Sequence, residues 1–278
     1  MKVACLQVCA GDDMAQNLAR VSEGVREAAA AGADFITTPE NVALMAARRT
    51  QLLEHAVAEA EHPAVARFSE LAASVGRWVL AGSIGVAAGD GRIFNRSLLF
   101  DPEGKVAARY DKIHMFDVTL PGGETYQESR NYRPGSAAVV AELAGVTLGM
   151  TVCYDVRFPA LYRALGQAGA QIITVPSAFT ATTGRAHWSA LLRARAIETG
   201  AFVVAPAQVG THPANRKSYG HSMIVAPWGE VILDAGEALG VTYADLDFST
   251  VTKARQSIPA WGATTEFALP APANRCAS

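Results

Sequence analysis

Residues 149–159 read GMTVCYDVRFP, a stretch that changes from apolar to polar at Cys153. The apolar residues before Cys153 are typical of a buried β-strand, and Pro159 is typical of the first turn of a helix. A cysteine at such a strand-to-helix turn presents its sulfur at the edge of a sheet, where neighbouring backbone N–H groups can bind a developing oxyanion. Cys153 is therefore a candidate nucleophile, and a buried, unreactive cysteine is the commoner alternative.

Strands and helices alternate on both sides of Cys153 and predict an α/β fold. The expected strands are 3–8, 34–38, 78–86, 149–153, 172–175 and 202–207, the expected helices are 17–30, 63–75, 159–168 and 186–198, and hairpins are expected at 96–110 and 222–233. Residues 31–39, AGADFITTP, resemble residues 168–176, AGAQIITVP. A two-sheet sandwich of related halves would accommodate this similarity, and chance in an Ala- and Gly-rich chain is the alternative. Because no linker divides the chain, we expect one domain over 1–262 and an Ala/Pro-rich tail over 263–278.

The composition excludes several classes of protein. Hydrophobic residues make up 50% and charged residues 18% of the 278 residues, which is typical of a globular protein. A formal net charge of −2 gives no reason to expect nucleic acid or an anionic membrane as partner. No apolar run approaches the length of about 20 residues that a membrane span needs. Four cysteines without a CxxC pair indicate neither a disulfide framework nor a structural zinc site. With no signal peptide at the N-terminus, the cytoplasm is the expected location.

A thiol nucleophile needs a base, and two isolated charges follow apolar strands. Glu40 follows residues 35–39, and Lys112 follows residues 107–111. A carboxylate beside a lysine and a thiol, away from bulk water, can act as a base. For each residue alone, a solvated charge on a loop is the alternative.

Three motifs, in this order, resemble the nitrilase superfamily of carbon–nitrogen hydrolases. They are residues 38–41 (TPEN), 110–114 (YDKIH) and 153–159 (CYDVRFP), and the resemblance extends over residues 2–258. It implies a nitrilase-type α-β-β-α sandwich, hydrolysis of carbon–nitrogen bonds, no metal or organic cofactor, and a homodimer or larger assembly. The Ala/Pro tail departs from the basic tail of the family.

The resemblance also implies a role for each matching residue. Cys153 would be the nucleophile and Glu40 the general base. Lys112 would stabilise the oxyanion together with the backbone N–H of Tyr154. Glu128 matches a second glutamate of the family, which would orient Lys112.

Within the superfamily, the second half of the chain most resembles deaminated-glutathione amidases and the related omega-amidases. The similarity lies in residues 176–179, 182–184, 187–188, 192–199, 219–223 and 227–229. This resemblance implies cleavage of the amide of a 2-oxo dicarboxylate through a thioester. Deaminated glutathione, giving 2-oxoglutarate and cysteinylglycine, is the first candidate substrate. The alternatives are 2-oxoglutaramate, 2-oxosuccinamate and a carbamoyl amide.

Three further residues are candidates for substrate binding. Arg157 could bind the substrate carboxylate through two parallel hydrogen bonds, and an ion pair with Asp155 or Glu198 is an equally good interpretation. Phe179 and Thr183 follow the strand beside that of the candidate nucleophile, and Phe179 is equally compatible with a core position.

Other classes of function fit the sequence less well. Residues 81–85 (AGSIG) miss the GxSxG motif of serine hydrolases at one position, and a turn follows where that motif requires a helix. No GxGxxG follows a strand, which disfavours a dinucleotide enzyme. A binding module without turnover on the same fold is a further alternative, against which the complete set of Glu40, Lys112 and Cys153 argues.

Overall fold

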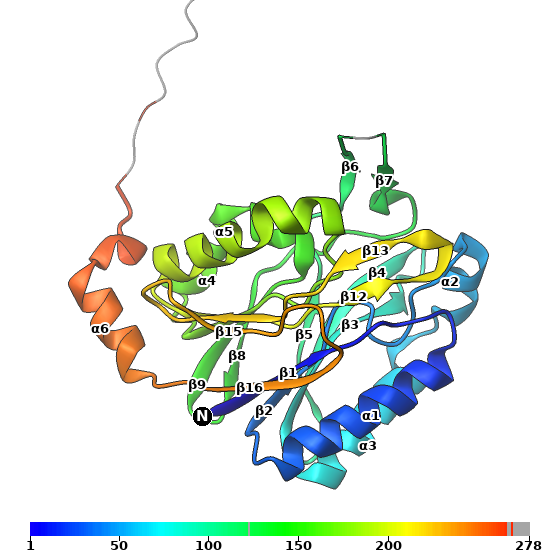
Figure 1. The fold of residues 1–278 in the computed structure, drawn as a ribbon, viewed down its shortest axis with the longest axis horizontal. Helices are drawn as coiled ribbons and strands as arrows, with labels where there is room; N and C mark the ends of the chain where they lie inside the picture. Colours follow the sequence, from blue (N-terminus) through cyan, green and yellow to red (C-terminus); the bar gives the residue numbers. More distant parts are fainter. Residues whose placement is uncertain (122, 266–267, 269–278) are drawn as a thin grey trace, which may run out of the picture.

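The computed structural model describes residues 1–121, 123–265 and 268. Within them, two six-stranded sheets face each other, and helices cover their outer surfaces (Figure 1). This is the predicted α-β-β-α sandwich in one domain. Most of the predicted Ala/Pro tail, 263–278, lies outside the described residues, and the predicted division at 262 stays a prediction.

The two sheets have the same arrangement of strands. The first has the order β16-β1-β2-β3-β4-β5, and the second, read from its equivalent edge, has the order β8-β9-β10-β11-β14-β15. The strands of the first are β1 (Lys2–Gln7), β2 (Phe35–Thr37), β3 (Trp78–Ala87), β4 (Ile93–Phe100), β5 (Val106–Asp111) and β16 (Gly240–Asp245). Those of the second are β8 (Val139–Leu143), β9 (Val146–Met150), β10 (Ile172–Thr174), β11 (Phe202–Ala205), β14 (Met223–Val225) and β15 (Val231–Asp234).

Each sheet is built around three parallel strands. These are β1, β2 and β3 in one sheet and β9, β10 and β11 in the other. The outer strands are antiparallel to their neighbours. The similar segments 31–39 and 168–176 contain β2 and β10, the central strand of each parallel set, so the sequence similarity coincides with equivalent places in the two sheets.

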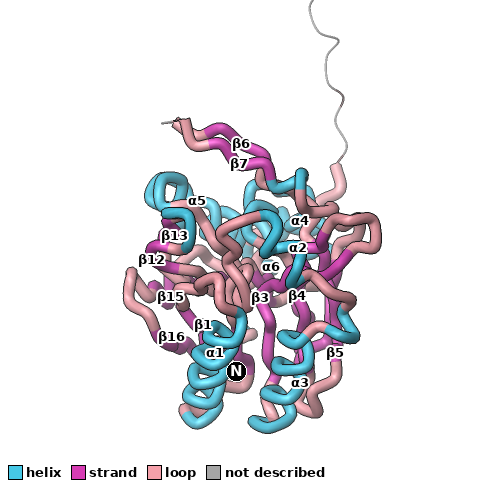
Figure 2. The backbone as a smooth tube through the Cα atoms, turned by 90° about the vertical axis from the view of Figure 1, so that its right-hand side faces the viewer, coloured by secondary structure: helices cyan, strands magenta, loops and turns pink. Residues whose placement is uncertain are grey.

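Helices form the two outer layers (Figures 1 and 2). α1 (Met14–Ala30) and α3 (Pro63–Val75) pack on the first sheet, and α4 (Pro159–Gln167) and α5 (Ala181–Thr199) lie together over the second. Asp13 begins α1 by accepting a hydrogen bond from the N–H of Gln16 at 3.0 Å. Gly76 ends α3 with a φ of 61°, a left-handed conformation that favours glycine.

Alternate residues of β1 point into two different cores. Val3 and Cys5 pack between the sheets, in one cluster with Met150 of the opposite sheet. Ala4 and Leu6 pack between the first sheet and its helices. Successive side chains of a strand face opposite sides, so a strand between two apolar layers needs apolar residues throughout. This explains the uninterrupted apolar run at the start of the chain.

Some element boundaries differ from the prediction. β9 ends at Met150, so Cys153 lies beyond the strand and not at its last residue. α5 begins at Ala181 and not at residue 186, because Thr180 caps it. Gly184 lies inside this helix. A glycine is needed there because an added Cβ would come 2.3 Å from Cγ of Tyr219.

The prediction also omitted several elements. They are β8, β16, α2 (Arg49–His55), α6 (Ser249–Ser257), the hairpin of β6 (Asp117–Thr119) and β7 (Thr125–Gln127), and the hairpin of β12 (Val209–Thr211) and β13 (Lys217–Tyr219). The β6–β7 hairpin projects from the body of the molecule within the polar segment after Lys112 (Figure 1).

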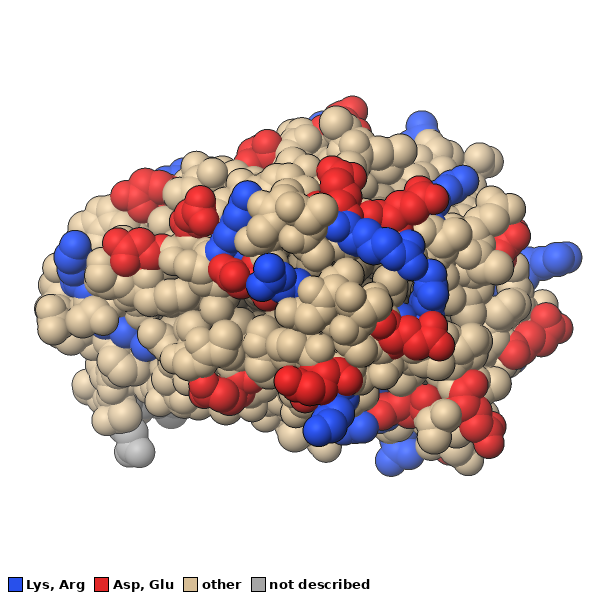
Figure 3. Space-filling model, turned by 90° about the horizontal axis from the view of Figure 1, so that it is seen from below, with Lys and Arg blue, Asp and Glu red and all other residues tan. Residues whose placement is uncertain are grey.

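None of the described helices combines the length and apolar character needed to cross a membrane. Acidic and basic side chains are interspersed on the face drawn in Figure 3.

Candidate active site

Cys153 lies in the turn between β9 and α4. It begins a short 3₁₀ helix, Cys153–Arg157, and its φ of 49° is in the left-handed region, which is uncommon for residues other than glycine. Its backbone N–H donates to the carbonyl of Pro176 at 3.0 Å, which ties the turn to the segment after β10. The next N–H, that of Tyr154, belongs to the first turn of the helix, where N–H groups have no partner within the helix.

Glu40 follows β2 and is 2% exposed. Its Oε2 accepts the backbone N–H of Ala178 at 2.8 Å, and its Oε1 lies 3.0 Å from Nζ of Lys112. The side chain of Gln208 donates to its backbone carbonyl at 3.0 Å. Since Ala178 and Gln208 belong to the other half of the sandwich, Glu40 connects the two sheets.

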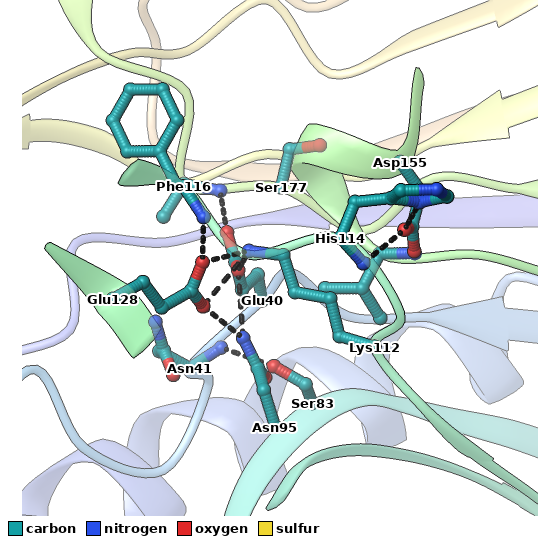
Figure 4. Close-up of polar contacts among 12 residues, drawn as sticks. Glu40, Asn41, Ser83, Asn95, Lys112, His114, Phe116, Glu128, Asp155 and Ser177 are labelled. Carbon is teal, nitrogen blue, oxygen red and sulfur yellow. Dashed lines mark hydrogen bonds and ion pairs between the residues drawn. The ribbon is translucent and has the colours of Figure 1, made fainter. Parts of the chain in front are cut away.

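Lys112 lies between two carboxylates (Figure 4). Its Nζ is 3.0 Å from Oε1 of Glu40 and 2.9 Å from Oε2 of Glu128. The N–H of Phe116 donates to Glu128 at 2.6 Å and fixes that carboxylate. All three charged side chains are thus held by further contacts and do not move freely in solvent.

Asn95 of β4 is a further member of this cluster, and the sequence reasoning missed it. Its Nδ2 donates to Oε1 of Glu40 at 2.9 Å and to Oε1 of Glu128 at 3.2 Å. An asparagine at a buried position of a strand was the available signal, because a buried amide requires hydrogen-bond partners.

Asp155 joins the cysteine turn to the segment that carries Lys112. Its carboxylate accepts the hydroxyl of Tyr110 at 2.7 Å and the N–H of Val152 at 2.9 Å. It also lies 2.7 Å from Nδ1 of His114 (Figure 4). Tyr110 and His114 flank Lys112, so one buried carboxylate positions both parts of the site.

Burial and charge set the pKa values of this cluster. Burial raises the pKa of the Cys153 thiol, and the adjacent charge of Glu40 raises it further. Burial alone would raise the pKa of Glu40, yet the charges of Lys112 and Arg216 and hydrogen bonds with Cys153 and Lys112 outweigh it, so this pKa is lowered. Burial disfavours the charge of Lys112, but the charges of Glu128 and Glu40 hold its pKa well above the usual value. At neutral pH the cluster therefore contains a thiol, a carboxylate and an ammonium group.

The AGSIG segment supports this cluster from β3. Ser83 is buried, and its Oγ accepts the backbone N–H of Asn41 at 2.9 Å. An added Cβ on Gly82 would come 1.9 Å from the carbonyl oxygen of Thr38. The Gly-Ser pair therefore holds the turn of Glu40, which agrees with rejecting it as a serine-hydrolase motif.

A cavity of about 310 Å³ opens onto the charged cluster. This volume is at the lower end of the range for small-molecule sites. Of the residues predicted from the sequence, Glu40, Lys112, Glu128, Cys153, Tyr154, Phe179 and Thr183 line it. The sequence reasoning missed other lining residues, among them Phe116, Tyr126, Tyr132 and Arg216.

Arg157 is not among the residues that line this cavity. Its guanidinium lies 5.2 Å from the ring centroid of Phe179 and 5.9 Å from that of Tyr154, and its Nη2 lies 3.3 Å from Nδ1 of His187. The alternative of an ion pair with Asp155 or Glu198 is wrong, since Asp155 binds the groups described above and Glu198 pairs with Arg195 at 2.8 Å.

Phe179 and Thr183 combine a structural role with a place on the cavity wall. The Phe179 ring packs against Trp188 at 4.9 Å between centroids. Oγ1 of Thr183 lies 2.8 Å from Oγ1 of Thr180, the residue that caps α5.

Comparisons with known proteins show the family to which this fold belongs. The model of the carbon-nitrogen hydrolase family matches residues 2–256. The chain belongs to this family. It is 41% identical to a deaminated glutathione amidase of Yersinia enterocolitica (92% of this chain, 90% of that protein) and 33% identical to omega-amidase NIT2 of Homo sapiens (93% and 92%).

Solved structures of similar fold include the following two. The C. elegans NitFhit protein has a TM-score of 0.87 and 32% identity, and the match covers 93% of this chain and 63% of that one. A mutant of the amidase from Nesterenkonia sp. AN1, with acrylamide added at its active-site cysteine, has a TM-score of 0.78 and 26% identity over 93% and 98% of the chains. The predicted fold, family and enzyme class are thus confirmed, and the chain is a hydrolase of carbon–nitrogen bonds.

Proposed function

We propose that this carbon–nitrogen hydrolase cleaves the amide bond of deaminated glutathione through a thioester on Cys153. The observation that carries the proposal is the position of Cys153 at a left-handed turn beside the Glu40–Lys112–Glu128 cluster and the cavity. A thiol, a buried base and a buried cation at one wall are the groups that acyl transfer from an amide requires.

In the first step, Glu40 takes the thiol proton while the sulfur of Cys153 forms a bond to the amide carbon. The carbonyl oxygen becomes an oxyanion, which Lys112 and the N–H of Tyr154 bind. The carbon–nitrogen bond then breaks, Glu40 gives the proton to the leaving nitrogen, and an acyl thioester remains.

In the second step, water replaces the amine. Glu40 takes a proton from the water as its oxygen attacks the thioester carbon. The carbon–sulfur bond then breaks, the carboxylic acid leaves, and Cys153 regains the proton.

The pKa shifts explain why both steps need the cluster. The thiol pKa is raised and that of Glu40 is lowered, so proton transfer at rest is unfavourable. It becomes favourable only when the new oxyanion is bound beside Lys112, since this cation compensates the negative charge. Glu128 and Asn95 act as positioning residues that hold Lys112 and Glu40 in register.

The choice of a 2-oxo acid over an amino acid follows from charge. Glu40 and Glu128, the two carboxylates among the described residues that line the cavity, both contact Lys112, so neither is free for the ammonium group of glutathione. A desolvated ammonium without a partner is costly. Arg157 is half-buried, and burial lowers the pKa of its guanidinium. A substrate carboxylate near Phe179 and Thr183 would compensate this cation. Similarity to a relative named deaminated glutathione amidase supports the same substrate.

A substrate panel tests the proposal. We expect deaminated glutathione to have the highest kcat/KM among deaminated glutathione, glutathione, 2-oxoglutaramate, 2-oxosuccinamate and an N-carbamoyl amide. Mass spectrometry after rapid acid quench should show the 2-oxoglutaryl group on the peptide that contains Cys153. Equal rates on glutathione and its deaminated form would contradict the assignment.

Omega-amidase activity is the second candidate. It is supported by the 33% identity to omega-amidase NIT2, and 2-oxoglutaramate contains the same acyl group as deaminated glutathione. A kcat/KM for 2-oxoglutaramate above that for deaminated glutathione would favour it. A carbamoyl-amide hydrolase and a binding module without turnover are the remaining alternatives, which the panel also separates.

We further propose a homodimer or larger assembly in the cytoplasm. Ile197 of α5 and Trp228 beside it are 52% and 57% exposed, an apolar pair suited to pairing through the outer helix layer. Cys5, Cys9 and Cys153 are free, as expected in a reducing compartment. Light scattering at micromolar concentration tests the assembly, and a monomer would contradict it.

A further inference from the structure

Arg216 brings a half-buried cation with a buried Nε to the cavity, and this cation binds no group in the proposed reaction. It is the last residue of the loop between β12 and β13 and lines the cavity. Its Nη2 donates to the carbonyl of Ala178 at 3.2 Å, and its Nε is buried without a hydrogen-bond partner. Among the described residues, no carboxylate forms an ion pair with Arg216, so part of its hydrogen-bonding capacity is directed at no protein group.

The loop holds Arg216 in place. The N–H of His212 donates to the carbonyl of Arg216 at 2.8 Å and closes the loop. The ring of His212 contacts the carbonyl of Ala10 and Oγ of Ser218, each at 2.9 Å. The guanidinium lies 6.0 Å from the ring centroid of Tyr126. A fixed guanidinium loses little freedom when it binds an anion.

The charges around the cavity favour an anionic ligand. Lys112 is neutralised by Glu40 and Glu128. The cavity is also lined by three further cations, Arg48, Arg49 and Arg216. None of them forms an ion pair with a described side chain. Arg48 and Arg49 are exposed at the rim, whereas Nε of Arg216 is buried.

Arg216 lies on the Glu40 side of the site. It binds the carbonyl of Ala178, whose N–H binds Glu40. In the proposed reaction Glu40 gives its proton to the leaving nitrogen, so the leaving group extends past this carboxylate. Arg157 does not line the cavity, and its guanidinium lies near the rings of Phe179 and Tyr154.

We propose that Arg216 binds the terminal carboxylate of the leaving peptide, and so makes the site selective for amides whose amine part ends in a carboxylate. The inference rests on the proposed function, because deaminated glutathione carries one carboxylate on each side of the scissile bond. The simple amide 2-oxoglutaramate lacks the second carboxylate, since its leaving group is ammonia. A guanidinium and a carboxylate form two parallel charge-assisted hydrogen bonds, for which the free Nε and a terminal nitrogen are suited.

Two substrates that differ only in this carboxylate test the proposal. They are deaminated glutathione and the analogue in which the carboxylate of its terminal glycine is replaced by an amide. The scissile bond and the acyl group are the same in both. We expect wild-type kcat/KM to favour the acid by about tenfold or more. In Arg216→Gln this ratio should fall to near one, mainly through a higher KM for the acid.

The ratio separates carboxylate binding from an effect on the base. Arg216 also lowers the pKa of Glu40, so Arg216→Gln should slow both substrates to some extent. An equal loss on acid and amide, with the ratio unchanged, would show that Arg216 acts only through Glu40 and would overturn the proposal. Arg26→Gln, an exposed arginine on α1, is the matched control and should leave the ratio and both rates unchanged.

A binding measurement distinguishes this inference from the proposed function. Calorimetry with Cys153→Ala, with and without Arg216→Gln, gives the dissociation constants of the same two compounds without turnover. Tighter binding of the acid that disappears with Arg216→Gln supports the subsite, even if wild-type turnover of deaminated glutathione is poor and the proposed function fails. Equal affinity for acid and amide in Cys153→Ala overturns the subsite, whatever the turnover.

Discussion

The two sheets share one strand order but carry different chemistry at their edges. After the central strand of the first sheet, Pro39 is followed by Glu40, a buried carboxylate that contacts Lys112. After the central strand of the second sheet, Pro176 is followed by Ser177, whose hydroxyl only contacts the carbonyl of Val175 at 2.9 Å. The same backbone plan thus presents a charged group on one sheet and a structural hydroxyl on the other.

The difference shows a division of roles between the halves. The first sheet carries the charged and amide groups, Glu40, Asn95 and Lys112, which stabilise one another. The second carries Cys153 and the N–H of Ala178. The two sets meet only because the sheets pack face to face, and the site therefore depends on the sandwich as a whole.

Replacing the nucleophile of the second sheet should have the largest effect. We expect Cys153→Ala to lower kcat by about 10⁴-fold or more, since no other group can form the thioester. Cys9→Ala is the control and should keep most of the activity, because this cysteine contacts Thr211 and His212 and none of the proposed reacting groups. Steady-state kinetics on deaminated glutathione checks both variants, and near-normal turnover by Cys153→Ala would exclude the thioester mechanism.

Glu40→Gln removes the base while keeping the shape of the side chain. We expect kcat to fall by about 10³-fold, within the usual range for general acid–base catalysis. The thiol should also react more slowly with iodoacetamide than the wild-type thiol does, because a neutral amide cannot accept its proton. Alkylation as fast as in the wild type would contradict a role of Glu40 as the base.

Lys112→Met removes the cation between the two carboxylates. We expect kcat/KM to fall by about 10²- to 10³-fold through loss of oxyanion binding. The pH profile should change as well. The wild-type pKa of Glu40 is lowered. Glu40 therefore stays ionised, and activity persists, as the pH falls through the range in which ordinary carboxyl groups take up a proton. Without Lys112 the pKa of Glu40 rises, so the acid limb of the variant moves to higher pH. An acid limb of the pH profile at the same pH as in the wild type would contradict this coupling. Lys253→Met on α6 is the control.

Gly82→Ala tests the support that β3 gives to the Glu40 turn. Its Cβ would lie 1.9 Å from the carbonyl oxygen of Thr38, so backbone must move. We expect a loss of about 1–3 kcal/mol in the free energy of unfolding, as for other overpacked sites, together with lower activity. Gly262→Ala has no atom within 4 Å of its Cβ and should change neither. Chemical denaturation measures both, and an unchanged Gly82→Ala would show that the turn adapts without cost.

The sequence predicted the central layers well because buried strands leave a strong apolar signal. β1, β2, β10 and β11 are short apolar runs, and the Pro-Glu and Cys-Tyr-Asp motifs at strand ends indicated the site. The outer elements β8, β16 and α6 were missed, since exposed edge strands and a polar helix have weak patterns.

The site residues missed by the sequence reasoning act through contacts distant in the chain. Asn95 reaches Glu40 across 55 residues, and Arg216 reaches Ala178 across 38. No local spacing encodes such contacts. An ion pair of Arg157 with Asp155 or Glu198 was one of two interpretations of this residue. It does not form among the described residues, because Asp155 joins the cysteine turn to Tyr110 and His114 and Glu198 pairs with Arg195.

Ser177→Ala should have the smallest effect and completes the comparison of the sheets. Ser177 occupies the position in the second sheet that Glu40 occupies in the first, and it is fully buried. Its hydroxyl makes one hydrogen bond, to the carbonyl of Val175, whereas its backbone N–H and carbonyl bond to Pro206 and Gln208. The substitution keeps the backbone bonds and removes one buried hydrogen bond, which is worth about 1 kcal/mol. We therefore expect a small loss of stability in denaturation and a kcat/KM near the wild-type value. A large loss of activity, comparable to that of Glu40→Gln, would mean that both sheets supply chemistry at this position and would contradict the division of roles.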